Sequence, residues 1–132
     1  MEKESNLLLA KYLRGIARYT LLVVLVLVFI FALLSGSGDY GGGLKGILYN
    51  SPNALPWFIL LIVLFVAWKW ELVGGILITL IGMAAMYFFN FRGPNFFWFT
   101  FFLCLGIIIF GSFFIISWYL DRKAKNYPEV AD

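Results

Sequence analysis

The sequence lacks histidine altogether and contains one cysteine, Cys104, among its 132 residues. Zinc and haem sites built on imidazole are therefore excluded, as are the nucleophilic catalytic sites that use histidine as a base. One cysteine cannot form an intramolecular disulfide bond, and its place within an apolar run is typical of a small buried side chain. We predict that the protein is not an enzyme and that it binds no metal ion and no cofactor.

Charged residues are also scarce, because they make up 13% of the chain, whereas hydrophobic residues make up 63% and aromatic residues 20%. A soluble domain has about 25% charged and about 45–50% apolar residues. A globule of this length could not bury such an excess of apolar surface, so the composition predicts that lipid is the solvent. The net charge of +3 is small. Its basic residues lie near the ends of apolar runs instead of along one face, which argues against a nucleic-acid partner.

Four long stretches without charge predict four transmembrane helices, at about residues 19–36, 54–70, 71–90 and 96–120. A helix needs about 20 residues to cross the hydrocarbon core of a bilayer, and only a helix satisfies its backbone groups within one apolar segment. We start the second helix near Ala54, because Pro56 then lies in the first turn, where its missing N–H costs nothing. The predicted fold is an all-α integral membrane bundle of four antiparallel, up-down helices.

The boundary between the second and third helices contains no glycine or proline, only Trp68, Lys69, Trp70 and Glu71. The alternative to a break is one apolar helix of about 55 Å, which would overshoot any bilayer. A tight helical hairpin is therefore the better interpretation.

Two polar segments flank the predicted membrane domain of residues 19–120. Residues 1–18 are basic and amphipathic, and we expect them to lie along the membrane surface. Their positive charges either set the topology or bind anionic lipid. Residues 121–132 form a polar tail. A cleavable signal peptide is disfavoured, because the 18 residues before the first apolar run are too many for such a leader.

Basic residues are distributed unevenly between the two predicted sides of the membrane. With the N-terminus inside, the inner segments hold eight Lys and Arg residues and the outer loops hold two, Lys45 and Arg92. This positive-inside bias predicts that both termini are cytoplasmic. The expected location is the cytoplasmic membrane of a prokaryote.

Glu71 is the first candidate for a functional residue, because a carboxylate next to lipid is costly. One interpretation makes it an interfacial cap that complements the dipole at the N-terminus of the third helix. A sharper interpretation places it inside the bundle, where it pairs with Arg18 or titrates as a proton or cation site. Lys69 is a further candidate, although on a continuous helix it would not face Glu71, two residues away.

Small residues recur at spacings of three and four on the third predicted helix, at Gly75, Thr79 and Gly82. Such a stripe permits close approach by another helix, either within the chain or in a second copy. Elsewhere, residues 36–41 match the glycine pattern of dinucleotide-binding sites, but a predicted membrane helix precedes them where such a site needs a strand. We therefore expect no nucleotide partner.

The junction of the second and third helices carries a resemblance to a known family. It follows a first span that begins after Arg18, and it reads Trp68-Lys69-Trp70-Glu71-Leu72-Val73-Gly74-Gly75. This run is similar to the hairpin motif of small four-helix membrane proteins that are classed as a domain of unknown function. The resemblance implies the four-helix fold and the membrane location. It implies no activity and no site residue.

Two classes of function remain open. The first is a structural or interaction protein in the lipid bilayer, which binds another membrane protein or a second copy of itself through the small-residue face of the third helix. The alternative is an oligomeric subunit of a small transporter or channel. A transport path needs several polar groups near the middle of the bilayer. The predicted spans offer few, mainly Thr79, Thr100, Cys104 and Ser112, which favours the first class.

Overall fold

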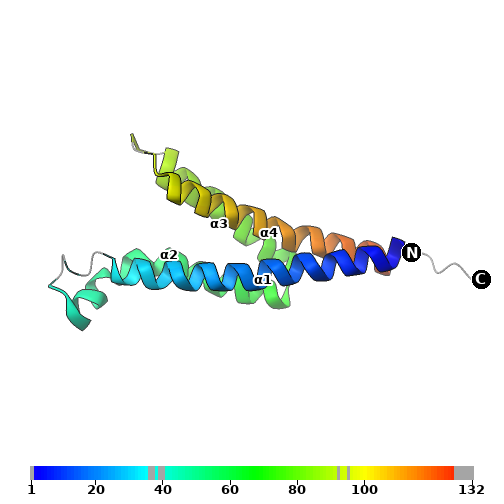
Figure 1. Cartoon of the computed structure of the whole chain (residues 1–132), viewed down its shortest axis with the longest axis horizontal. Coiled ribbons are helices and arrows are strands. Elements are labelled where there is room, and N and C mark those ends of the chain that lie inside the picture. Colours follow the sequence, from blue (N-terminus) through cyan, green and yellow to red (C-terminus); the bar gives the residue numbers. More distant parts are fainter. Residues whose placement is uncertain (1, 36–37, 39–40, 92, 95, 127–132) are drawn as a thin grey trace, which may run out of the picture.

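The computed structural model describes residues 2–35, 38, 41–91, 93–94 and 96–126, and all regular structure within these residues is helical. Four α-helices follow one another: α1 (Glu2–Leu34), α2 (Gly43–Lys69), α3 (Glu71–Met86) and α4 (Trp98–Lys125). A π-helical turn, η2 (Tyr87–Phe91), continues α3. The start of α1, the end of α4 and the α2–α3 joint lie toward one end of the molecule, called here the basal end (Figure 1). The α1–α2 and α3–α4 connections lie at the other end, the distal end.

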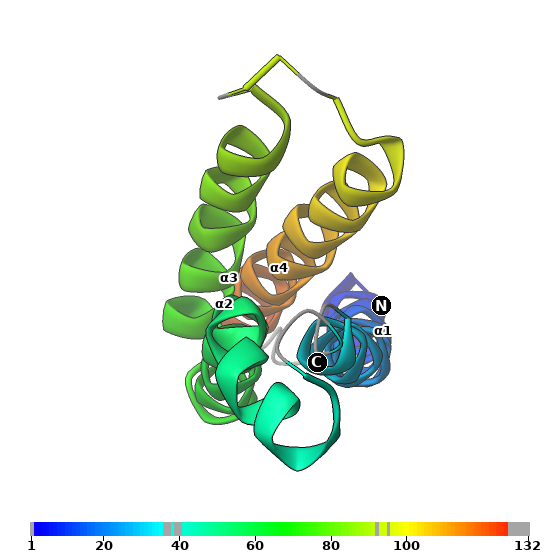
Figure 2. The same ribbon diagram turned by 90° about the vertical axis from the view of Figure 1, so that its left-hand side faces the viewer.

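The helices form two pairs, α1 with α2 and α3 with α4, which meet in the basal half and diverge toward the distal end (Figures 1 and 2). All four helices contribute fully buried side chains to one core, among them Leu21, Leu64, Ile78 and Phe114. The core therefore connects the two pairs even though their distal ends are apart.

Each of the four helices is long and apolar enough to cross a membrane. Only 22–33% of the residues in the most apolar stretch of each helix are buried within the protein. Large side chains such as Val23, Leu80 and Phe102 are exposed. Continuous exposure of this kind is rare in soluble monomers, and it indicates contact with a lipid bilayer. The prediction of an all-α bundle of four membrane-length helices is confirmed.

The first helix begins earlier than the predicted span at residues 19–36. The N-terminal segment, expected to lie separately along the membrane surface, is continuous with the rest of α1 from Glu2 onward. Its buried residues Ala10 and Ala17 continue the same stripe as Leu21 and Leu25. Because these spacings of four and seven keep one face turned toward the other helices, nothing interrupts the helix at residue 18.

The second helix also begins earlier than the sequence predicts, at Gly43 instead of near Ala54, and it contains both Pro52 and Pro56. Pro52 has no N–H to donate to the carbonyl of Leu48, one turn back. The hydroxyl of Ser51 donates to that carbonyl instead, over 2.7 Å. The helix therefore continues through the prolines, with a bend near its start (Figure 1).

The last two helices lie close to their predicted positions. Together α3 and η2 cover Glu71–Phe91, and α4 runs past residue 120 to Lys125. Arg92, residues 127–132 of the tail, and most of the glycine-rich residues 36–41 lie outside the described residues.

Candidate functional site

The α2–α3 joint is a break of one residue, Trp70, whose backbone is not helical (φ −119°, ψ 87°). The break places Glu71 at the first position of α3. The turn is so tight that a Cβ atom added to Gly74 would lie 2.2 Å from the Cα atom of Ala67. Only glycine fits at this position without a shift of the backbone. The predicted hairpin between the second and third helices is present.

Glu71 forms a two-pronged ion pair with Arg14 of α1. Arg14 Nε donates to Glu71 Oε1 over 3.1 Å, and Arg14 Nη2 donates to Glu71 Oε2 over 2.9 Å. The two side chains are mostly buried, with 24% of Arg14 and 13% of Glu71 exposed. A planar guanidinium held by both oxygens of a carboxylate is the strongest geometry for such a pair. The pair ties α1 to the start of α3.

The structure places Glu71 at the start of α3, as the cap interpretation expects, and pairs it with an arginine, as the second interpretation expects, but with a different one from that proposed. The residue does begin α3, but its carboxylate is bound to a cation instead of acting only as a hydrated cap, and the cation is Arg14 instead of Arg18. Arg18 Nη2 donates over 2.9 Å to the carbonyl of Trp68 near the end of α2, and its guanidinium lies 5.0 Å from the centre of the Trp68 ring. Lys69 lies over the ring of Trp70. Arg18 therefore binds the end of α2, while Arg14 binds the start of α3.

Asp121 of α4 extends this contact to a third helix. One of its oxygens lies 3.8 Å from Arg14 Nη2 and 3.2 Å from Lys125 Nζ. Lys123 of α4 also lies 3.8 Å from Glu2 of α1. We call Arg14, Glu71 and Asp121 the basal ion cluster. The cluster links α1, α3 and α4, and the charge of Lys125 balances the second carboxylate.

Sequence reasoning missed Arg14 and Asp121 as members of the site. A signal for Arg14 was present, because it falls in register with Ala10, Ala17 and Leu21 on the face of α1 that is buried. A lone arginine on an otherwise apolar, small-residue stripe needs a buried partner. Asp121 gave a weaker signal, since an acidic residue beside Lys and Arg at a helix end is usually solvated.

Comparisons with known proteins place this hairpin and its helices in a family. A family model described as a domain of unknown function, DUF7670, matches residues 4–126. The chain belongs to this family. A search of curated proteins and a search of solved structures found no match. The expected membership of a family classed as a domain of unknown function is thus confirmed over most of the chain, and the matched residues include the basal ion cluster.

In this DUF7670 chain, the small-residue stripe of α3 packs against α4. A Cβ atom added to Gly75 would lie 2.8 Å from Phe114 Cβ, and one added to Gly82 would lie 2.9 Å from Ile108 Cγ1. From the other side, a Cβ atom on Gly111 would lie 2.7 Å from Thr79 Oγ1. The stripe at Gly75, Thr79 and Gly82 is thus used within the chain. It is not free for a partner, contrary to the function first suggested for it.

Three hydroxyl groups of the DUF7670 spans donate hydrogen bonds to their own helices. Thr79 Oγ1 donates to the carbonyl of Gly75 over 2.8 Å, and Ser112 Oγ donates to the carbonyl of Ile108 over 2.8 Å. Ser117 Oγ donates to the carbonyl of Phe114 over 3.1 Å. Cys104 is fully buried, as expected of a small apolar side chain. Each of the three hydroxyl donors is therefore satisfied within its own helix.

At the distal end, asparagine side chains satisfy backbone groups within each helix pair. Asn50 of α2 donates to the carbonyls of Ala32 and Leu33 over 3.1 and 2.9 Å, and also to that of Ser35. In the other pair, Asn90 accepts a hydrogen bond of 3.0 Å from the N–H of Phe97. Both asparagines are buried. They act on helix ends and loops, and they join helices of the same pair.

Proposed function

We propose that this DUF7670 protein is a structural or accessory component of the membrane, which acts by binding another membrane component and catalyses no reaction itself. The observation that carries this proposal is that polar side chains in the spans form hydrogen bonds within their own helices. Thr79, Ser112 and Ser117 donate to carbonyls of their own helices, and the ionic groups that link helices are gathered at the basal end.

The rival function is an oligomeric transporter or channel subunit. Such a subunit needs polar or ionisable side chains on the faces that would line a path between copies. The exposed side chains midway along the described helices, such as Val23, Ile62 and Leu80, are apolar. This composition supports an accessory role over transport.

Photo-crosslinking in native membranes tests the accessory role. A crosslinking amino acid at Leu80, which is exposed on α3, should yield a discrete heavier species that contains a second membrane protein or a second copy of the chain. The same amino acid at Ile78, which is fully buried, is the matched control and should yield none. Purified protein in sealed vesicles should pass ions and small solutes no faster than empty vesicles. Flux above that background would favour the transporter.

We also propose that both termini are cytoplasmic, in the cytoplasmic membrane of a prokaryote. The support is the concentration of Lys and Arg in the predicted inner segments. A fluorescent reporter that matures only in the cytoplasm, fused after Asp132, should be bright. Alkaline phosphatase, which needs the periplasm, should be inactive at the same position. The reverse pattern would contradict this orientation.

A further inference from the structure

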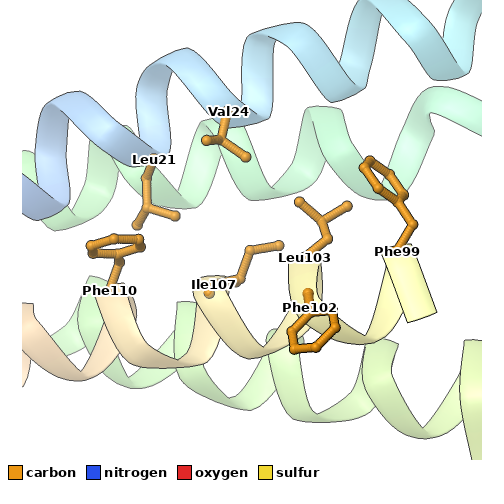
Figure 3. Close-up of a pocket in the computed structure, with 8 residues that line it drawn as sticks. Leu21, Val24, Phe99, Phe102, Leu103, Ile107 and Phe110 are labelled. Atoms are coloured by element: carbon orange, nitrogen blue, oxygen red, sulfur yellow. The ribbon is translucent and has the colours of Figure 1, made fainter.

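An apolar groove of about 290 Å³ separates α1 from α4 where the helix pairs begin to diverge. In Figure 3, Leu21 and Val24 of α1 point toward Leu103, Ile107 and Phe110 of α4. Gly106 completes the wall of the groove. A Cβ atom on Gly106 would meet nothing within 4 Å, so the space beside it is open.

The groove is closed at one end and open at the other. At its closed end Leu21 and Ile107 are each 1% exposed, whereas Phe99 at the distal end is 71% exposed. Beyond the closed end, α1 and α4 pack closely around Ala17 and Phe114, both fully buried. The groove therefore follows only the distal part of the interface between α1 and α4.

The length of the groove matches one leaflet of a bilayer. Its lining residues on α4 extend from Phe99 to Phe110, a stretch that rises about 16 Å along the helix axis. Tryptophans favour the interface between lipid and water, and Trp98 and Trp118 lie about 30 Å apart along α4, close to the thickness of the hydrocarbon core. The groove thus covers the half of the core next to the distal end, from Trp98 to the midplane.

We infer that this groove binds one acyl chain of a phospholipid from the leaflet at the distal end. A transmembrane helix of a partner, or of a second copy, is about 10 Å wide and must cross about 30 Å of hydrocarbon. It would meet the closed basal half of the α1–α4 interface. An acyl chain is thin, ends at the midplane and needs no polar partner, which fits a groove lined only by apolar side chains. This lipid site does not depend on the proposed accessory function.

Photolabelling with a phospholipid tests the site directly. The full chain is placed in phosphatidylcholine nanodiscs that contain a trace of phosphatidylcholine with a diazirine in the middle of one chain, and adducts are mapped by mass spectrometry. We expect adducts to concentrate on residues 99–110 and 21–24. The exposed face of α3 around Leu80 and Met83 reports the background from lipid that merely surrounds the protein.

A matched pair of glycine substitutions provides the control. Gly106→Leu fills the groove and should reduce its labelling to the α3 background. Gly15→Leu makes the same change at a second helical glycine with open space around it, and it should leave the labelling of the groove unchanged. Circular dichroism checks that each variant folds, and Val24→Phe fills the groove from the opposite wall if Gly106→Leu does not fold. Equal labelling of groove and background, groove labelling that survives Gly106→Leu, or crosslinks between two protein chains through the groove would each overturn the inference.

Discussion

The basal and distal ends of this bundle are held together in different ways. At the basal end, ionic contacts cross between the helix pairs, because Arg14 of α1 reaches Glu71 of α3 and Asp121 of α4. At the distal end, the polar contacts of Asn50 and Asn90 stay within their own pairs. Between the pairs, the distal half has apolar contacts such as the stacked rings of Trp57 and Phe89.

This difference shows how the helices of a small membrane protein can be closely packed at one end and separated at the other. Lipid chains are as apolar as leucine, so apolar contacts alone give helices little preference for each other over lipid. Close packing around glycine and charge-assisted hydrogen bonds provide that preference at the basal end. Where both are missing between the pairs, α1 and α4 separate and leave the groove.

The largest effect is expected where the basal packing is tightest. Gly74→Ala should destabilise the protein by about 3 kcal/mol, because the new Cβ atom would lie 2.2 Å from the backbone of Ala67. Gly106→Ala in the open distal groove should change stability by less than about 1 kcal/mol. Unfolding titrations in mixed micelles measure both variants. Equal losses of stability in the two variants would show that the helices pack as tightly around Gly106 as around Gly74, and would contradict an open distal end.

Removing one partner of the basal ion pair should have the next largest effect. Arg14→Met leaves the mostly buried Glu71 carboxylate without its cation, and we expect a loss of about 2 kcal/mol. The double variant, with Glu71→Met as well, should recover most of this loss because no unpaired charge remains. Strictly additive losses in the double-mutant cycle would mean that the two residues do not act as a pair.

A smaller effect, confined to one helix pair, is expected at the distal end. Asn50→Leu removes the amide that binds three carbonyls at the end of α1, at a cost of about 1–1.5 kcal/mol. Amide exchange should accelerate in the last turn of α1 and stay unchanged around Glu71. Asn53→Leu is the control, because among the described residues Asn53 donates a single bond, of 3.1 Å to Ala32, and its loss should cost less. Faster amide exchange at the α2–α3 joint would show that the distal contact also stabilises the basal end, and would contradict an effect confined to one helix pair.

The smallest effect is expected at the edge of the basal ion cluster. Asp121 lies 3.8 Å from Arg14 and is 27% exposed, so Asp121→Asn should cost at most about 0.5 kcal/mol. The same unfolding titration measures it, beside Arg14→Met. A loss as large as that of Arg14→Met would show that Asp121, instead of Glu71, is the main partner of Arg14.

Much of the fold could be predicted from the sequence because it depends on local patterns. The charge-free runs are long enough to span a bilayer, which predicts the four helices. The combined length of the second and third apolar runs predicts the α2–α3 break near Lys69 and Glu71, because no bilayer accommodates one helix of that length. The spacing of Gly75, Thr79 and Gly82 predicts a close helix contact, although it does not say which helix fills it.

The remaining features depend on contacts between segments that are far apart in the sequence. Arg14 and Arg18 are one turn apart on α1, so which of them meets Glu71 is decided by the position of α1 along the α2–α3 joint. The early part of α2 is bound to the end of α1, because Asn50 donates to the carbonyls of Ala32 and Leu33. The groove between α1 and α4 arises from the divergence of whole helices, which no local pattern encodes.

Distances between spin labels in nanodiscs test the central claim most directly. With Cys104 replaced by alanine, one label pair is placed at Tyr12 and Tyr119 near the basal end and another at Phe31 and Phe99 near the distal end; all four positions are exposed. A bundle that is tied at the basal end and open at the distal end predicts a longer and broader distance distribution for the distal pair. Equally short and narrow distributions for both pairs would show that the helices pack evenly along their length, and would contradict the account.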